Sequence, residues 1–471
     1  MRSTLAILFS LLALFSFSQT YNYYFGNLHA HTGLSDGSKD SLKSGVSRPD
    51  GAYAYARFSQ DFDFLGISEH NHYSARNNPG FKRPGYQVGL DMASAANQEG
   101  SFLALFGMEY GVSSNTNGHV LIYGFNSLLG WEQGNYDIYN AKTDYDSLFR
   151  KVRNNPNAFA CLAHPGFSDF SRNGTVAGAL AYAPYNAGYD SAIVGTPLRS
   201  GLAFSTDSNY SDYPQGNYFA YYLQLLSKGY HLGIGYDHDN HYTNFGRSNG
   251  GRLVILAPSL TRNNLMAAMQ QMHFYGSDDR NARIGFDLDG QIMGSQLSGG
   301  TYPTLSVTHN DPDGEQADSI KIWKGANNGS GQLPAVVHVA LNSNTASFTD
   351  YNLQSGIEYY YFSEIKQADG QWIVTSPIWY RSLVSQGLRE ENNPGLKFLC
   401  FSNPVSRQLS MSVSQPGHYT ATLQDISGRT VLETDFEGQG ASVDLSMLPA
   451  GVYLVALCTG TVVLTKKMIL D

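Results

Sequence analysis

The chain has 471 residues, enough for roughly two to four domains, and a formal net charge of −9 at pH 7. This acidic balance argues against a stable complex with nucleic acid, which requires a basic surface. Three cysteines, Cys161, Cys400 and Cys458, are too few for a disulfide framework, although Cys400 and Cys458 could pair within the last domain.

Residues 1–18 have the pattern of a signal peptide. Arg2 forms the basic region, Leu5–Phe15 forms the apolar core, and Ser16–Ser18 is a small-x-small cleavage site. The apolar stretch is shorter than the roughly 20 residues that span a bilayer, and no other stretch is long enough. We therefore expect an exported protein that begins near Gln19 and has no transmembrane span.

Helix-like and strand-like stretches alternate from about residue 21 to 275, and we assign residues 19–285 to one domain. Such alternation predicts an α/β fold with a mainly parallel sheet. Seven β-like runs separate the helices, and the seventh is Tyr189–Val194. The expected helices are Asp50–Phe58, Val88–Gln98, Tyr145–Arg153, Tyr218–Leu226 and Arg262–Met272.

A candidate metal site begins where the β-prone run Tyr21–Leu28 leads into two histidines one residue apart. In an extended strand, residues i and i+2 point to the same face, so His29 and His31 aim their imidazoles at one point. Asp36 follows on a Gly/Ser-rich loop that can fold its carboxylate back toward that point. Two imidazoles and a carboxylate suit a divalent transition metal.

Histidine, aspartate or glutamate recurs at the ends of later apolar runs in this domain. A single histidine is usually a structural imidazole, but a set at successive strand ends predicts metal ligation. These polar residues lie at strand ends, which is also where α/β barrels place their active sites. The runs are residues 63–70, 102–109, 119–124, 158–165 and 231–241.

In their order, these motifs resemble the polymerase-and-histidinol-phosphatase (PHP) family of metal-dependent phosphoesterases over about residues 21–290. The resemblance implies a distorted seven-stranded (β/α) barrel that binds two to three divalent ions of zinc, manganese or iron. It implies that Glu109 bridges two metals. The implied ligands are His29, His31, Asp36, His70, Glu109, His119, His164, Asp239 and His241.

The resemblance assigns catalytic roles to Glu69, His70 and Glu109, with one departure from the family pattern. The family has an aspartate where this chain has Glu69, whose longer side chain could reach a metal, hold His70 or shift the general acid/base. His72 and His238 flank the matched positions and could support a ligand, face the substrate or have only a local role.

The closing motif of the site is ambiguous because two acidic residues precede its histidines. Asp237 and His238 stand directly before Asp239, Asn240 and His241, so the motif can be placed on either set. We prefer Asp239 and His241 as ligands, since a spacing of two places both side chains on one face.

A cluster of three divalent ions would outweigh the charge of three ligand carboxylates, which favours an anionic substrate. Divalent metals lower the pKa of a bound water to about 7, so the water can attack phosphorus as hydroxide. We therefore expect an exported hydrolase of phosphomonoesters or phosphodiesters. Two alternatives stay open: hydrolysis of a non-phosphate ester or amide, and a surface-attached binding module with a structural metal site.

Short alternating runs separated by Asp-Gly turns predict a β-sandwich at residues 286–385. A polar linker at residues 386–395 leads to a second small β domain at residues 396–471. Its motifs at Asp425–Arg429, Leu448–Tyr453 and Lys466–Leu470 are similar to the C-terminal sorting domain of the type IX secretion system. The resemblance implies binding to that secretion machinery, followed by attachment to the cell surface or release.

Overall fold

The computed structural model describes residues 20–58, 62–72, 83–112, 118–166, 169–171, 177–384, 398–401, 405, 407–459 and 462–471. The chain divides into two compact units, Met1–Val384 and Ser385–Asp471. The expected signal peptide at residues 1–18 and the expected linker at residues 386–395 lie outside the described residues.

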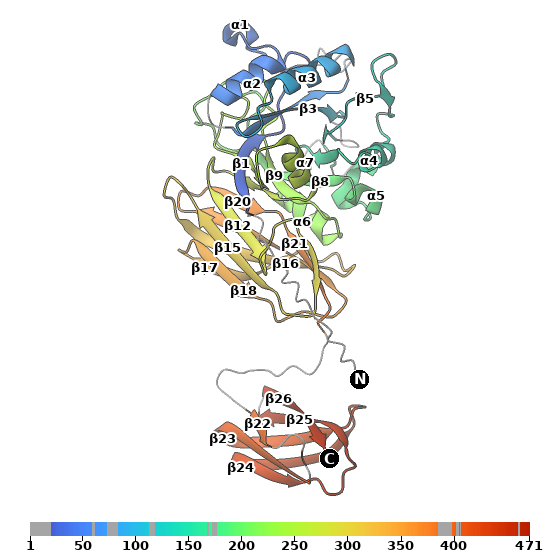
Figure 1. Ribbon diagram of the computed structural model, residues 1–471, viewed down its shortest axis with the longest axis vertical. Helices are drawn as coiled ribbons and strands as arrows, with labels where there is room; N and C mark the ends of the chain where they lie inside the picture. The colour runs from blue at the N-terminus through green and yellow to red at the C-terminus, as the bar shows by residue number, and fades with distance from the viewer. Residues whose placement is uncertain are drawn as a thin grey trace, which may run out of the picture. The chain divides into compact units, whose positions relative to one another are not determined.

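The larger unit is built on one long mixed sheet (Figure 1). The strands of this sheet that come first in the chain are β1 (Asn22–Asn27), β2 (Phe64–His70), β3 (Leu103–Tyr110), β4 (Val120–Tyr123), β7 (Phe159–Leu162), β8 (Ile193–Ser200), β9 (Gly233–Asp237), β10 (Arg252–Ala257) and β11 (Phe274–Ser277). They lie in the order β11-β10-β1-β2-β3-β4-β7-β8-β9. A short pair, β5 (Leu129–Gly130) and β6 (Ile138–Tyr139), forms a separate ribbon.

The same sheet continues beyond β11, because β11 pairs with β20 in antiparallel register. The continuing strands are β14 (Gln296–Gly299), β16 (Ala317–Asn327), β17 (Ala335–Leu341), β19 (Glu358–Gln367), β20 (Trp372–Thr375) and β21 (Ile378–Ser382). A second sheet, in the order β13-β12-β15-β18, shares an apolar core with β16 and β19. Its strands are β12 (Arg283–Leu288), β13 (Gln291–Ile292), β15 (Thr304–Asn310) and β18 (Thr345–Thr349).

The expected architecture, an α/β seven-stranded (β/α) barrel followed by two small sandwiches, is wrong. The chain is mostly β, and among the described strands β9 ends the path of the long sheet without closing a barrel. The connection at residues 111–119 is shorter than the roughly dozen residues that a parallel crossover needs, so β4 runs antiparallel to β3. The pairing of β11 with β20 then carries the sheet on into the region expected to be a separate sandwich.

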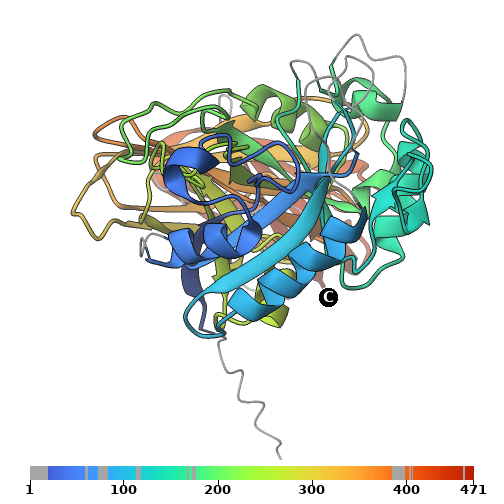
Figure 2. The ribbon, with the colours of Figure 1, turned by 90° about the horizontal axis from the view of Figure 1, so that it is seen from above.

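The five expected helices are confirmed to within a few residues. They are α2 (Pro49–Phe58), α3 (Arg83–Ala96), α4 (Tyr145–Arg153), α6 (Phe219–Ser227) and α7 (Arg262–Gln270). Short helices α1 (Ser41–Ser44), α5 (Ala187–Asp190) and η1 (Ala177–Tyr182) are additional, and the strand expected at Tyr189–Val194 is the end of α5 and the start of β8. In Figures 1 and 2, α2 and α3 lie in blue beside β2 and β3, on which they pack.

Helix α4 shows how local sequence fixes these helices. Asp144 caps its first turn by accepting a hydrogen bond from the backbone N–H of Ser147 at 2.9 Å. Leu148, Phe149 and Val152 recur at helical spacing and are buried. None of the helices in the described part of the chain has the length and apolar content needed to cross a membrane.

The smaller unit contains one five-stranded antiparallel sheet. Its apolar core is made by inward-facing side chains such as Leu409, Leu423, Val455 and Leu457. Cys458 is a free thiol, and the side chain of Cys400 lies outside the described residues. The strands are β22 (Phe398–Phe401), β23 (Gln408–Gln424), β24 (Thr430–Asp444), β25 (Gly451–Thr459) and β26 (Val462–Leu470).

Candidate metal centre

The nine ligands suggested by the sequence come together at one edge of the long sheet, in overlapping groups. His29 and His31 directly follow β1, His70 ends β2, and Glu109 lies one residue before the end of β3. Strand β4 runs antiparallel to β3, so His119, just before β4, starts from this same edge. The strand directions therefore deliver side chains from distant parts of the sequence to one place.

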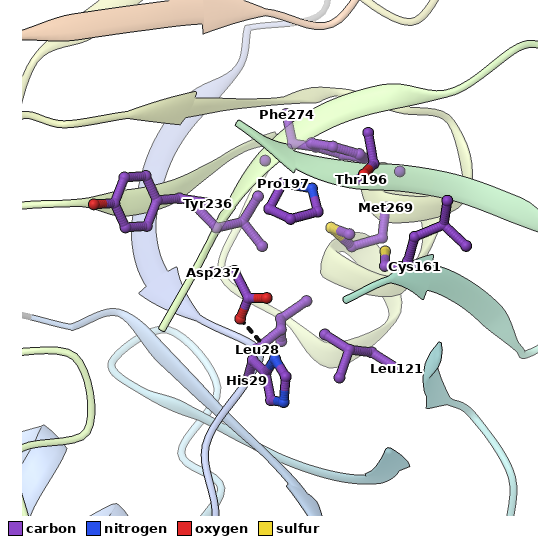
Figure 3. Close-up of a pocket in the computed structure, with 14 residues that line it drawn as sticks. Leu28, His29, Leu121, Cys161, Thr196, Pro197, Tyr236, Asp237, Met269 and Phe274 are labelled. Atoms are coloured by element: carbon purple, nitrogen blue, oxygen red, sulfur yellow. Dashed lines mark ion pairs between the residues drawn. The ribbon is translucent and has the colours of Figure 1, made fainter. Parts of the chain in front are cut away.

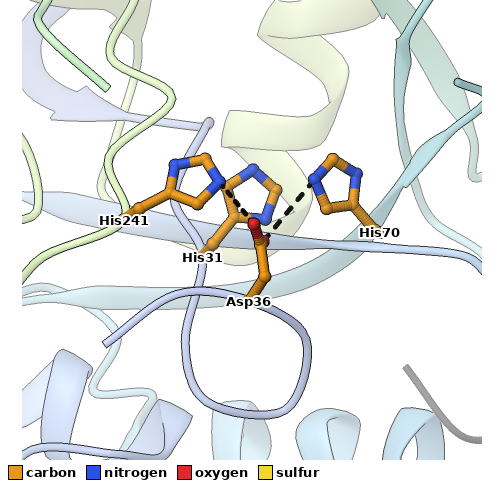
Figure 4. Close-up of side chains that lie close together, drawn as sticks. All are labelled: His31, Asp36, His70 and His241. Carbon is orange, nitrogen blue, oxygen red and sulfur yellow. Dashed lines mark ion pairs between the residues drawn. The ribbon is translucent and has the colours of Figure 1, made fainter. Parts of the chain in front are cut away.

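The first group of ligands consists of His31, Asp36, His70 and His241 (Figure 4). The Asp36 carboxylate lies between two imidazoles, with Oδ2 3.2 Å from Nε2 of His241 and Oδ1 3.6 Å from Nε2 of His70. The His31 ring lies 4.5 Å from the His241 ring and 4.6 Å from the His70 ring, measured between centroids.

The second group consists of His29, Glu109, His164 and Asp239. Nε2 of His29 lies 3.3 Å from Oε1 of Glu109 and 3.3 Å from Oδ1 of Asp239. Nε2 of His164 also lies 3.3 Å from Oε1 of Glu109. Four donor atoms from four segments of the chain thus surround one small volume.

Glu109 is shared with a third group, which adds His119 and includes His70. Its Oε1 lies 3.3 Å from Nδ1 of His119, and its Oε2 lies 2.9 Å from Nδ1 of His70 and 3.3 Å from Nε2 of His31. The carboxylate therefore reaches imidazoles of all three groups, as a ligand that bridges neighbouring ions would.

The separations of 3.3 Å among these atoms fit a metal better than direct hydrogen bonding. Charge-assisted N–H···O bonds are usually about 2.7–2.9 Å long, whereas two ligands of a tetrahedral zinc ion lie about 3.3 Å apart. Nε2 of His29 and Nε2 of His31 also lie 3.3 Å apart, although both nitrogens are buried. Oε2 of Glu109 is buried and accepts no hydrogen bond of normal geometry from the described residues. The donor set therefore fits divalent ions.

The electrostatics of the cluster also favour added positive charge. Burial lowers the pKa of His29, but the carboxylates of Asp237, Glu109 and Asp239 raise it to about 9. Burial raises the pKa of Glu109, yet the surrounding imidazoles hold it well below its usual range. The carboxylates of the cluster thus stay ionised inside the protein and need cations beside them.

Two further carboxylates hold the ligand imidazoles in place: Asp237, which the sequence offered as an alternative in the closing motif, and Asp169, for which the sequence gave no assignment. Oδ1 of Asp237 lies 2.6 Å from Nδ1 of His29 (Figure 3), leaving Nε2 of that ring to face the cluster. Oδ2 of Asp169 lies 2.8 Å from Nδ1 of His164 and 3.1 Å from Nδ1 of His119. Carboxylates in this position fix the tautomer and orientation of metal ligands.

Glu69 belongs to none of the ligand groups and supports the loop that carries Asp36. Its side chain accepts hydrogen bonds from the backbone N–H of Thr32 at 3.0 Å and from the hydroxyls of Thr32 and Ser35. Its nearest approach to a ligand imidazole is 3.9 Å, from Oε2 to Nδ1 of His31. The contacts place Glu69 beneath the first group, where it orders the loop.

The backbone is in an unusual conformation at two of the ligands. Asp239 has φ of 52° and His164 has φ of 30°, values that residues other than glycine rarely adopt. Such conformations cost free energy and concentrate at functional sites, where the surrounding structure holds them. The backbone conformation at these two residues directs both side chains toward the second group.

The flanking histidines support the cluster from outside it. The His72 ring stacks on the His70 ring with centroids 5.4 Å apart, and burial lowers its pKa to about 3. Nε2 of His238 donates a hydrogen bond to the carbonyl of Gly251 at 2.9 Å. The remaining histidines belong to none of the ligand groups that the described residues form: His231, His273, His309, His338 and His418.

A small cavity of about 30 Å³ lies behind the second group, between His29, Asp237 and apolar residues such as Leu28 and Phe274 (Figure 3). This volume suits roughly one water molecule and excludes a substrate. Of the nine ligand side chains, those of His164 and Asp239 are the most exposed, at 19% and 22%.

Residues 400–471 match the family of secretion system C-terminal sorting domains. The protein is secreted or attached to the cell surface. The sorting domain also implies an interaction with the type IX secretion machinery, as its sequence motifs indicated. Among curated proteins, none matches the chain. The resemblance of the first domain to PHP phosphoesterases stays a prediction.

Proposed function

We propose that the exported protein is a metal-dependent hydrolase of phosphomonoesters or phosphodiesters. The central support is the Glu109 carboxylate, which lies within 3.3 Å of imidazole nitrogens in all three ligand groups. A structural zinc site is closed by four ligands, whereas nine donors in overlapping groups supply a cluster with room for substrate oxygens. When bound, two or three divalent ions would activate water and neutralise phosphate charge.

The protein's own residues would position these components. Asp237 and Asp169 hold the imidazoles of His29 and His164 so that Nε2 of each ring faces Glu109. Lys39 lies beside the first group, with Nζ 3.3 Å from Oδ2 of Asp36 and its side chain 32% exposed. An ammonium group there would attract an anionic substrate to an otherwise acidic protein.

The test is to purify the mature protein without chelator and measure bound metal and hydrolysis. We expect about two to three equivalents of zinc, manganese or iron, in keeping with the ligand count. We expect hydrolysis of p-nitrophenyl phosphate or bis-p-nitrophenyl phosphate that a chelator abolishes and added metal restores. Glu109→Gln should lose at least one equivalent and most activity, whereas Glu99→Gln, on the exposed surface, should retain both.

Three results would contradict the proposal. At most one equivalent of metal, unchanged by Glu109→Gln, would favour the surface-attached binding module. Full metal content without phosphoester hydrolysis would remove the assigned activity. Hydrolysis of p-nitrophenyl acetate or an amide in preference to both phosphoesters would identify the alternative hydrolase on the same donor set.

A further inference from the structure

A loop held by backbone hydrogen bonds lies beside the metal centre. The loop leaves β8 at Ser200 and returns at Gln215, where the two backbones exchange hydrogen bonds of 2.9 and 2.6 Å. Between these ends it runs along the segment that carries Asp239 and His241. The backbone N–H of Gly201 donates to the Asp237 carbonyl at 2.9 Å, and the N–H of His241 donates to the Ala203 carbonyl at 2.8 Å.

The tip of this loop places an exposed aromatic ring against a metal ligand. Phe204 is 63% exposed, and its ring centroid lies 4.7 Å from that of His241 with 37° between the ring planes. The residue on each side of Phe204 is tied down. Ala203 accepts the bond from His241, and the Ser205 carbonyl accepts one from Nδ2 of Asn244 at 2.8 Å.

Lys39 approaches the same ring, with Nζ 5.5 Å from the Phe204 centroid. The ammonium group also lies 3.3 Å from Asp36, so it spans the distance between the ring and the first ligand group. A cation and an exposed aromatic ring therefore lie together beside the first ligand group.

Exposure alone does not make Phe204 functional, because single apolar side chains are common on protein surfaces. What distinguishes Phe204 is its contact with a ligand, its contact with a cation and the hydrogen bonds that fix its neighbours. Stacking of a flat ring of a ligand on this exposed aromatic ring would lower the free energy of the complex. A small aliphatic phosphoester would leave this surface exposed.

We propose that Phe204 forms a stacking subsite and that the substrate is a phosphoester of an aromatic or heteroaromatic alcohol, or of a nucleoside. The ring of the substrate lies on Phe204, and its phosphate extends past Lys39 to the ligand groups. This inference rests on the proposed phosphoesterase function and narrows its substrate class.

The test measures binding of non-hydrolysable phosphonates to the metal-loaded mature protein by calorimetry. We expect phenylphosphonate to bind about tenfold more tightly than methylphosphonate, as stacking of two rings provides. Cyclohexylphosphonate, which is equally large but not flat, should bind less tightly than phenylphosphonate. This comparison needs no variant, so it holds even where a substitution impairs folding.

Variants then assign the preference to one residue. Phe204→Leu should remove most of the preference for the phenyl group, while the affinity for methylphosphonate and the metal content stay unchanged. Phe58→Leu is the matched control, because Phe58 is also a highly exposed phenylalanine, 73% exposed, at the end of α2. It should keep the full preference.

Each contrary result has a separate meaning. Equal binding of phenyl- and methylphosphonate, or an undiminished preference in Phe204→Leu, would overturn the stacking subsite and leave the phosphoesterase proposal standing. An equal loss of affinity for both ligands in Phe204→Leu would assign Phe204 a structural role and overturn the subsite as well. No binding of any phosphonate to fully metal-loaded protein would overturn both proposals.

Discussion

At the scale of single residues, the cluster depends on carboxylates with different tasks. Glu109 faces the imidazoles of three ligand groups, whereas Asp237 and Asp169 contact the far nitrogens of the His29 and His164 rings. Glu69 differs from all of them, because its hydrogen bonds go to Thr32 and to Ser35 in the loop before Asp36. A carboxylate so placed orders the loop, and it also lies 3.9 Å from the imidazole of His31.

Substitution of Glu69 separates this positioning role from the catalytic role that the PHP resemblance implies. Burial raises the pKa of Glu69 above its usual value, although His31 and the hydrogen-bond donors Ser35 and Thr32 act in the opposite direction. Glu69→Gln keeps an acceptor oxygen, so we expect nearly normal metal content and activity. Glu69→Ala leaves buried donors without an acceptor, so it should cost about 1–3 kcal/mol of stability and weaken metal binding by the first group.

The measurements are elemental analysis, urea unfolding and phosphoester kinetics on the wild type and both variants. A general base at this position would give a different result: Glu69→Gln would lose activity with its metal content intact. That outcome would restore Glu69 to the catalytic residues.

The convergence of these side chains could be predicted from the sequence because it follows from strand geometry. His29 and His31 share a face through the period of two, and His70 and Glu109 lie at the ends of fully buried runs. Asp169 had no such signal. It lies outside the described helices and strands, and only the fold reveals that its carboxylate reaches His119 and His164.

At the scale of elements, the helices were predictable and the sheet was not. Apolar spacing and a capping residue define α4 within its own segment. The direction and partner of a strand depend on distant segments: nothing within the β11 run Phe274–Ser277 specifies that it pairs with Trp372–Thr375. For this reason the expected barrel was wrong while the expected helices were confirmed.

His231 joins elements that are far apart in the chain, and this contact makes stability depend on pH. Nδ1 lies 3.0 Å from Oδ2 of Asp190 in α5, and Nε2 lies 3.1 Å from Oε2 of Glu358 in β19. Burial lowers the pKa of His231, but the hydrogen bonds to both carboxylates raise it to about 9. The imidazolium is therefore stabilised in the folded protein.

A raised pKa in the folded state stabilises the folded protein. The full stabilisation is present below the unfolded pKa of about 6.5, and it is lost as the pH rises through 9. We expect the free energy of unfolding to fall by about 1–3 kcal/mol between pH 6.5 and 9. Urea unfolding of metal-free protein across this range measures the effect, with His231→Gln as the comparison. Equal pH dependence in the wild type and the variant would refute the assignment.

At the scale of the whole molecule, the metal centre and the sorting domain belong to different compact units. All ligands lie between His29 and His241, and the family match begins at residue 400. We therefore expect residues 20–384 to fold alone, with the metal content and activity of the mature protein. Elemental analysis and thermal unfolding of this fragment test the expectation, and loss of bound metal would contradict it.

The strand pairing between β11 and β20 has a consequence for how the larger unit melts. Because hydrogen bonds run without interruption from the ligand-bearing strands into residues 286–384, neither half can open without exposing the edge of the other. The two halves should behave as a single cooperative block with one calorimetric transition. Ions held by a few side chains at one edge would then raise the melting temperature of the entire block.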